Sequence, residues 1–177
     1  MKATSNVLDF AVSPAAPVVS GASYRDAMSR LPTAVSIVTT RTPAGMAGFT
    51  ASAVCSVTDV PPTLLVCLNH AASVYTAFAS SDVLCVNVAS AGQQSVVAAF
   101  GGRTAMDDRF AAAQWHALCT GSPVLLGAAA AFDCRIVKRL PVGTHDVLFC
   151  EVLALSFDAE PQALAYFGRK FHRLVAA

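Results

Sequence analysis

The sequence has few charged residues and almost no net charge. Among its 177 residues, Lys, Arg, Asp and Glu together make up 13%, and the formal net charge is +1. Proteins that bind nucleic acid or anionic membrane surfaces concentrate positive charge on one face. The sequence therefore offers no electrostatic argument for either kind of partner.

The sequence also lacks an uninterrupted apolar run of membrane-spanning length. Hydrophobic residues reach 55%, but prolines and amides interrupt the uncharged stretches before they reach the roughly 20 residues of a transmembrane helix. High apolar content with so little charge predicts instead that part of the surface is covered in an oligomer, and we expect a homodimer. The length predicts one domain over residues 22–177, preceded by a flexible tail over residues 1–21 rather than a signal peptide.

Paired cysteine motifs are missing. No C-x-x-C occurs and no histidine stands at ligand spacing from a cysteine, so disulfide and metal sites are disfavoured. Most of the six cysteines lie in apolar, strand-like runs, where a free thiol packs as a small hydrophobic group. We therefore expect reduced core thiols and a cytoplasmic protein; the residues are Cys55, Cys67, Cys85, Cys119, Cys134 and Cys150.

Motifs for self-sufficient catalysis are absent as well. The sequence contains no P-loop, no G-x-G-x-x-G after a strand, no G-x-S-x-G and no H-E-x-x-H. With two glutamates and four histidines, the sequence has few candidates for general acids, general bases or metal ligands. This composition disfavours a hydrolase or a metal enzyme. An enzyme whose chemistry belongs to a bound cofactor needs fewer such groups.

Hydrophobic periodicity predicts more strands than helices. The expected strands cover residues 33–41, 63–69, 83–90, 131–139 and 146–158, and a further strand leads into residues 48–59. Short helices are expected after a capping box at Ser23–Asp26, over residues 71–80 and over residues 91–100, while residues 101–128 look irregular. Because regular βαβ units are missing, we expect an antiparallel barrel with a few peripheral helices.

The segment GFTASAVCSVTD, residues 48–59, has small side chains suited to close contact with a flat ligand. Its first eleven residues carry no charge, and hydroxyls stand at Thr50, Ser52 and Ser56. A planar ring that lies against backbone requires small side chains on the facing strand. A tightly packed sheet of small residues would have the same composition, so both interpretations remain open.

The segment LNHAASVYTAF has the features of an anion site. A strand is expected to end at Asn69, with Ser73 in the first turn of the helix that follows. Free backbone N–H groups and the helix dipole attract phosphate at such a point. An ordinary helix N-cap is the alternative.

Several segments in the same order resemble the short-chain flavin reductases, the small partners of two-component flavin monooxygenases. They are GFTASAVCSVTDVPPTLLVCLN, Ser73, LCVNV, FGG, DRF, Trp115, FDCR and GTHD, and the resemblance as a whole covers roughly residues 22–174. The segments AGFTASAVCSVTD and VGTHDVLFC look most like members of the Rut pathway of pyrimidine degradation. Reductase components of 4-hydroxyphenylacetate 3-monooxygenase look more distant.

The resemblance implies a mainly β fold, an antiparallel Greek-key split β-barrel with a few short helices. It also implies a homodimer that reduces FMN or FAD with NADH or NADPH and passes reduced flavin to a monooxygenase. The flavin ring and ribityl chain would meet Phe49, Thr50, Ala51, Ser52, Ser56 and Val57. The phosphate would meet Asn69, Ser73 and Arg109, with Phe100 and Gly101 closing the site. His145 would be the catalytic residue on the nicotinamide side, and the dinucleotide would meet Tyr166 and Arg169.

Each of these roles has a simpler structural alternative. His145 could hydrogen-bond within a turn, Arg109 could pair with Asp107 or another carboxylate, and Trp115 is more often a core or interface residue. The family usually reads Gly-Asp-His, whereas the acid follows the histidine here, at Asp146, which leaves the role of that acid open. The competing functions are an FMN-binding split barrel without turnover and an interaction domain without a cofactor.

Overall fold

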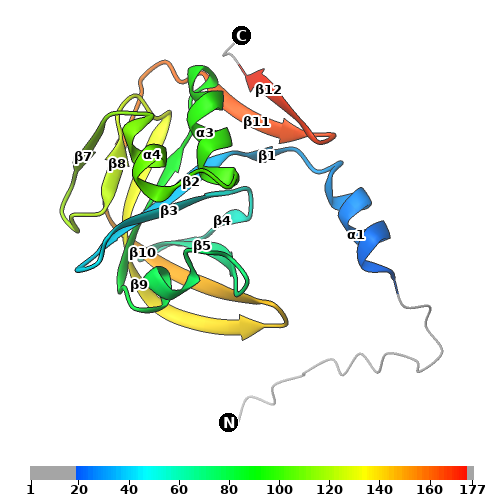
Figure 1. The fold of residues 1–177 in the computed structure, drawn as a ribbon, viewed down its shortest axis with the longest axis horizontal. Helices are drawn as coiled ribbons and strands as arrows, with labels where there is room; N and C mark the ends of the chain where they lie inside the picture. The colour runs from blue at the N-terminus through cyan, green and yellow to red at the C-terminus, as the bar shows by residue number, and fades with distance from the viewer. Residues whose placement is uncertain (1–18, 175–177) are drawn as a thin grey trace, which may run out of the picture.

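The computed structural model describes residues 19–174, so the predicted tail falls mostly outside the described residues. The chain forms a mainly β structure with a few short helices (Figure 1). In chain order the elements are α1 (Gly21–Met28), β1 (Thr33–Ala34), β2 (Ser36–Thr42), β3 (Gly45–Ala51), β4 (Val54–Asp59), β5 (Pro62–Asn69), α2 (Tyr75–Ala79), β6 (Val83–Val88), the 3₁₀ turn η1 (Ala91–Gln93), α3 (Gln94–Gly101), α4 (Met106–Ala111), β7 (Trp115–Ala117), β8 (Pro123–Leu125), β9 (Ala130–Val142), β10 (His145–Phe157), β11 (Ala163–Phe167) and β12 (Lys170–Leu174).

The barrel is one antiparallel seven-stranded sheet in the order β3-β2-β6-β9-β10-β5-β4. Its two edge strands, β3 and β4, are consecutive in sequence and are joined by Ser52 and Ala53, so the sheet must curl until its edges approach each other. The edges do not pair with each other, which leaves the barrel split. The small sheets β1-β11-β12 and β7-β8 lie outside it (Figure 1). The expected split-barrel fold is confirmed.

Two apolar cores lie on opposite faces of β2. Val38 packs inside the barrel with Phe78, whereas its neighbour Ile37 packs outward with Phe100 and Leu164 from α3 and β11. Successive side chains of a strand point to opposite faces, so both faces of β2 are buried. This explains why residues 33–41 are β-branched on both faces and do not alternate with polar residues.

Several predicted elements differ from the structure. The N-cap of helix α1 is Ser20, three residues before the predicted N-cap Ser23, because the Ser20 hydroxyl accepts the N–H of Ser23 at 3.1 Å. Residues 101–128, expected to be irregular, contain α4, β7 and β8. The helix predicted over residues 71–80 is reduced to the five residues of α2, so the prediction that Ser73 lies within its first turn is wrong.

The cysteines are all free, in agreement with the expectation, but they are not all in the core. Cys85, Cys134 and Cys150 are buried, and burial raises the pKa of the Cys150 thiol to about 12. Cys55 and Cys119 are exposed. The expectation of six packed thiols is therefore wrong at these two positions. None of the helices in the described part of the chain is long and apolar enough to cross a membrane.

Gly48 is required where β3 passes under α3. A Cβ atom on Gly48 would lie 2.7 Å from Cε1 of Phe100 and 3.1 Å from the carbonyl oxygen of Val38. Phe100 is buried and packs edge-on against Phe110, so its ring has little room to move. We expect Gly48→Ala to lower the free energy of unfolding by about 1–3 kcal/mol through overpacking, as measured by urea denaturation.

Gly92→Ala is the matched control for this substitution. A Cβ on Gly92 would meet nothing within 4 Å, so its effect is expected to stay within about 0.5 kcal/mol. Equal stabilities of the two variants would contradict the assigned contact between Gly48 and Phe100.

Candidate functional site

Two adjoining cavities lie along β3 and α3, one of them reaching the carboxyl end of β5 and the other reaching β11 and β12. The first, here called the Arg109 cavity, has a volume of about 370 Å³. It is lined by Phe49, Thr50, Cys67, Asn69, Ala72, Ser73, Val74, Phe100, Gly101, Gly102, Arg109 and His145. The second, the Tyr166 cavity, has a volume of about 340 Å³ and is lined by Val35, Thr50, Ser52, Val97, Ala98, Gly101, Gly102, Tyr166 and Phe171.

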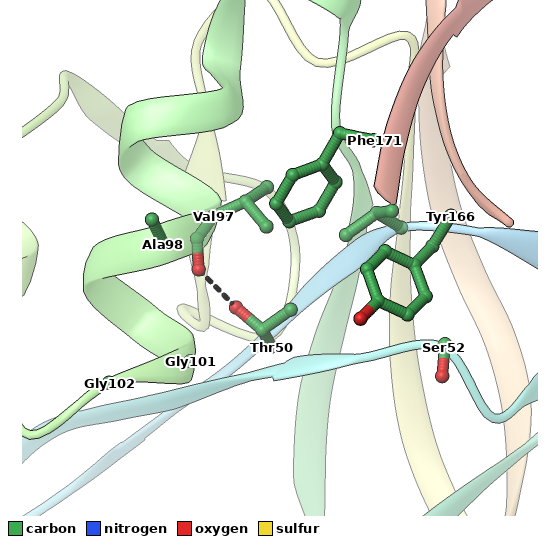
Figure 2. Close-up of a pocket in the computed structure, with 9 residues that line it drawn as sticks. Thr50, Ser52, Val97, Ala98, Gly101, Gly102, Tyr166 and Phe171 are labelled. Carbon is green, nitrogen blue, oxygen red and sulfur yellow. Dashed lines mark hydrogen bonds between the residues drawn. The ribbon is translucent and has the colours of Figure 1, made fainter. Parts of the chain in front are cut away.

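The two cavities share Thr50, Gly101 and Gly102. The Thr50 hydroxyl donates to the carbonyl oxygen of Val97 at 2.6 Å, which ties β3 to α3 at this junction (Figure 2). Figure 2 shows the rings of Tyr166 and Phe171 side by side above Ser52, with their centroids 5.3 Å apart. The Tyr166 cavity is thus lined by two aromatic rings and adjoins the Arg109 cavity at the three shared residues.

Arg109 is a buried cation held by backbone carbonyls. Arg109 is 6% exposed. Its guanidinium donates hydrogen bonds to the carbonyl oxygens of Thr104 (2.8 Å), Gly102 (3.0 Å), Gly48 (3.1 Å) and Phe100 (3.3 Å). These bonds use four of its five N–H groups. Within residues 19–174 it has no carboxylate partner, so the suggested pairing with Asp107 is wrong. Because no carboxylate neutralises the positive charge of Arg109, that charge can attract an anion into the cavity that Arg109 lines.

The segment between β5 and α2 supplies further donors beside Arg109. Asn69 folds the segment by accepting the N–H of Ala71 on its side chain (2.8 Å) and that of Ala72 on its carbonyl (3.0 Å). Within the described residues, the N–H groups of Ser73 and Val74 and the Ser73 hydroxyl have no intramolecular partner. A buried cation and free donors at one cavity fit an anionic group such as phosphate.

His145 is the first residue of β10 and faces the same cavity. Its Nδ1 lies 3.0 Å from the Thr144 hydroxyl, as the simpler turn interpretation expects. Its Nε2 has no hydrogen-bond partner within residues 19–174, and the side chain lines the Arg109 cavity. His145 is therefore both held by its turn and available to a ligand.

The structure brings most of the predicted site residues together. The Arg109 cavity contains eight of them: Phe49, Thr50, Asn69, Ser73, Phe100, Gly101, Arg109 and His145. Ser52 and Tyr166 line the adjoining Tyr166 cavity. The lining residues that were not predicted are Cys67, Ala72, Val74 and Gly102 in the first cavity and Val35, Val97, Ala98 and Phe171 in the second. Of these, Gly102 could have been recognised as the second half of the Gly101–Gly102 pair.

The remaining predicted residues lie elsewhere. The Ala51 side chain is buried in the barrel core. Ser56 lines a separate hollow with Cys55 on β4, and Val57 is exposed. Arg169 forms an ion pair with Asp26 of α1 at 3.3 Å, away from both cavities. Trp115 packs against Phe100 and Phe110, as its core interpretation predicted.

Residues 28–175 match the model of the flavin reductase like domain. The chain belongs to this family. It is 60% identical over 162 residues to FMN reductase (NADH) RutF of Variovorax paradoxus (strain S110), covering 92% of this chain and 90% of the relative.

Solved structures of flavin reductases share the fold. A putative flavin reductase from Haemophilus somnus 129PT superposes with a TM-score of 0.87 at 45% identity, covering 88% of this chain and all of that one. The styrene monooxygenase flavin reductase of Pseudomonas putida S12 superposes with a TM-score of 0.78 at 25% identity, covering 87% of this chain and 98% of that one. The flavin reductase of a monooxygenase is thus among the structural relatives of this chain.

Proposed function

We propose that this chain is an NADH-dependent FMN reductase that binds FMN in the Arg109 cavity. The observation that carries the proposal is the buried Arg109, which has no carboxylate partner within the described residues, beside the free donors of Ser73 and Val74. The family membership and the relative named FMN reductase (NADH) agree with it. The flavin, when bound, supplies the hydride-accepting chemistry, with NADH as the donor.

The residues of the two cavities bind the flavin phosphate, contact the flavin ring and position NADH. Ser73, Val74 and Arg109 bind the phosphate, while β3 at Phe49–Ser52 lies against the ring. His145 stands beside the cavity with Nε2 available and positions the nicotinamide of NADH. Tyr166 and Phe171 offer an aromatic surface to the nicotinamide ring, so that the nicotinamide and the flavin ring can be held in contact. Strong general acids are not required for this reaction.

One assay tests the activity. The protein is mixed with NADH, with and without FMN, and absorbance at 340 nm is followed under air. FMN-dependent loss of NADH is expected, and parallel runs with FAD and NADPH establish the preference. FMN binding without NADH oxidation would indicate an FMN-binding protein without reductase activity. Failure to bind any flavin would contradict both the reductase and the FMN-binding protein.

Gly101→Ala tests the site without disturbing the fold. A Cβ on Gly101 would lie 3.6 Å from Thr50, an ordinary contact, at the junction of the two cavities. Alanine also suits the end of α3 better than glycine, by up to about 1 kcal/mol. We expect an unchanged or higher melting temperature together with at least about tenfold weaker FMN binding in a fluorescence titration. Gly92→Ala is the control, and equal FMN affinities for the two variants would contradict the assigned junction.

The reduced flavin is proposed to serve a two-component monooxygenase in pyrimidine degradation. The likeness to the styrene monooxygenase flavin reductase supports a monooxygenase as the recipient, and the resemblance of AGFTASAVCSVTD and VGTHDVLFC to Rut pathway reductases supports pyrimidine degradation. Reconstitution with the large monooxygenase encoded nearest to this gene, with uracil as substrate, tests it. NADH-dependent loss of uracil is expected, whereas turnover of a phenolic substrate alone would favour an aromatic hydroxylase partner.

A homodimer is also proposed, because β10 exposes apolar side chains at alternate positions. Leu153, Leu155 and Phe157 share its outer face, and Phe157 is 72% exposed. A row of large apolar side chains on a sheet face is typical of an interface. Light scattering is expected to give twice the chain mass, and a monomer at micromolar concentration would contradict the dimer.

A further inference from the structure

Asp146 is a mostly buried carboxylate beside the proposed site. It is the second residue of β10, and its side chain is 13% exposed. Successive residues of a strand point to opposite faces, so Asp146 points away from the Arg109 cavity that His145 lines. Its side chain turns toward α2 and the segment before it. A role in direct contact with the ligand is therefore excluded by its direction.

The two partners of Asp146 lie at the two ends of one loop. Oδ1 of Asp146 lies 2.9 Å from Nε2 of His70, and Oδ2 accepts a hydrogen bond from the Tyr75 hydroxyl at 3.0 Å. His70 directly follows β5, and Tyr75 is the first residue of α2. The residues between them include Ser73 and Val74, which line the Arg109 cavity and whose N–H groups have no intramolecular partner within the described residues.

Further contacts make this attachment rigid. The N–H of His70 donates to the carbonyl oxygen of Thr144 at 3.0 Å, which fixes the loop to the turn before His145. The rings of His70 and Tyr75 meet edge to face with centroids 5.1 Å apart. One carboxylate thus joins both ends of the loop to the strand that carries His145.

The charges around Asp146 favour its ionised form. The hydrogen bond from His70 lowers the pKa of Asp146, and burial partly offsets this shift. The hydrogen bond from Tyr75 and the charge of Arg139 lower the same pKa further. The hydrogen bond to Asp146 in turn raises the pKa of Tyr75. The carboxylate therefore remains an acceptor and the phenol a donor at neutral pH.

We propose that Asp146 is a positioning residue for phosphate recognition, holding the loop 70–75 so that its free N–H groups face the cavity beside Arg109. The inference rests on the proposed FMN site and adds a residue that does not touch the ligand. It also gives a role to the acid that follows His145, which the sequence left open. The expected signature is a loss of discrimination between FMN and riboflavin, because riboflavin lacks the phosphate.

Asp133 provides a control on another loop. It is fully buried, and it accepts hydrogen bonds from the N–H of Thr120 at 2.8 Å and from its hydroxyl. Neither residue lines the two cavities. Asp133 thus anchors a loop as Asp146 does, but away from the proposed phosphate.

The experiment compares FMN and riboflavin dissociation constants by quenching of flavin fluorescence. Asp146→Ala is expected to weaken FMN binding about tenfold or more and to change riboflavin binding by less than about threefold. Asp133→Asn is expected to lower the melting temperature and to keep the FMN preference. Tyr75→Phe removes a single hydrogen bond and is expected to give an intermediate loss, so it serves if Asp146→Ala does not fold.

The outcomes separate this inference from the one on which it rests. Wild-type protein that binds FMN and riboflavin equally would overturn the phosphate assignment and this inference together. A wild-type preference for FMN that survives unchanged in Asp146→Ala, or in Tyr75→Phe if only that variant folds, would overturn the role of Asp146 alone. An equal loss of preference in Asp133→Asn would show a general effect of stability and would also overturn it.

Discussion

Replacing Arg109 with methionine is expected to lower the free energy of unfolding by at least about 4 kcal/mol and to abolish FMN binding. Methionine keeps an unbranched apolar stem but is shorter and has no N–H donor, so four backbone carbonyls lose their donor, at Gly48, Phe100, Gly102 and Thr104. The buried carbonyls of Gly48 and Phe100 each cost about 1–3 kcal/mol when left unpaired, and the part-buried carbonyls of Gly102 and Thr104 add a smaller cost. Urea denaturation measures the first effect and flavin fluorescence the second.

Arg109→Lys separates charge from geometry at this position. Lysine keeps the positive charge but cannot donate to four carbonyls in a planar fork. We expect an intermediate loss of stability, about 2 kcal/mol, with FMN binding weakened but measurable. Stability within about 1 kcal/mol of wild type in Arg109→Met would contradict the structural role assigned to the guanidinium.

Ser73→Asp is expected to raise the Kd for FMN by at least about 100-fold. Ser73 is exposed on the loop beside Arg109, so the substitution does not disturb the core. A carboxylate about 4 Å from a phosphate repels it by about 4 kcal/mol per pair of charges near a protein surface, and 100-fold corresponds to about 2.7 kcal/mol. Fluorescence titration at low ionic strength gives the clearest comparison.

Two controls accompany this substitution. Riboflavin binding by Ser73→Asp should change by less than about threefold, because riboflavin has no phosphate to repel. Ser80→Asp places the same charge just after α2, at a residue that lines neither cavity, and should bind FMN normally. An unchanged FMN affinity in Ser73→Asp would place the phosphate elsewhere.

The barrel strands could be predicted from sequence because their patterns are local. β9 begins as an alternation of apolar and polar residues, and β2 is β-branched where both of its faces are buried. Helix α4 was missed because it has only six residues and no side-chain cap. The strands β7 and β8 have three residues each, too few to show a period. Tertiary packing, rather than local preference, stabilises these short elements.

Most residues of the candidate site could be predicted from the sequence, but their hydrogen bonds and relative positions could not. Phe49, Asn69 and His145 come from three separate strands, and only the ordered resemblance to flavin reductases indicated that they meet. The bonds of Arg109 depend on where carbonyls from β3, α3 and the following loop converge, which no sequence spacing encodes. The link from Asp146 to His70 and Tyr75 likewise joins segments more than 70 positions apart.

A crystal structure of the protein grown with FMN tests the central claim most directly, because it locates the phosphate. We expect the phosphate oxygens within hydrogen-bond distance of the N–H groups of Ser73 and Val74, on the side of the cavity that Arg109 lines, with the ring against β3 at Phe49–Ser52. A phosphate bound outside the Arg109 cavity, for example in the hollow beside Ser56 on β4, would contradict the account.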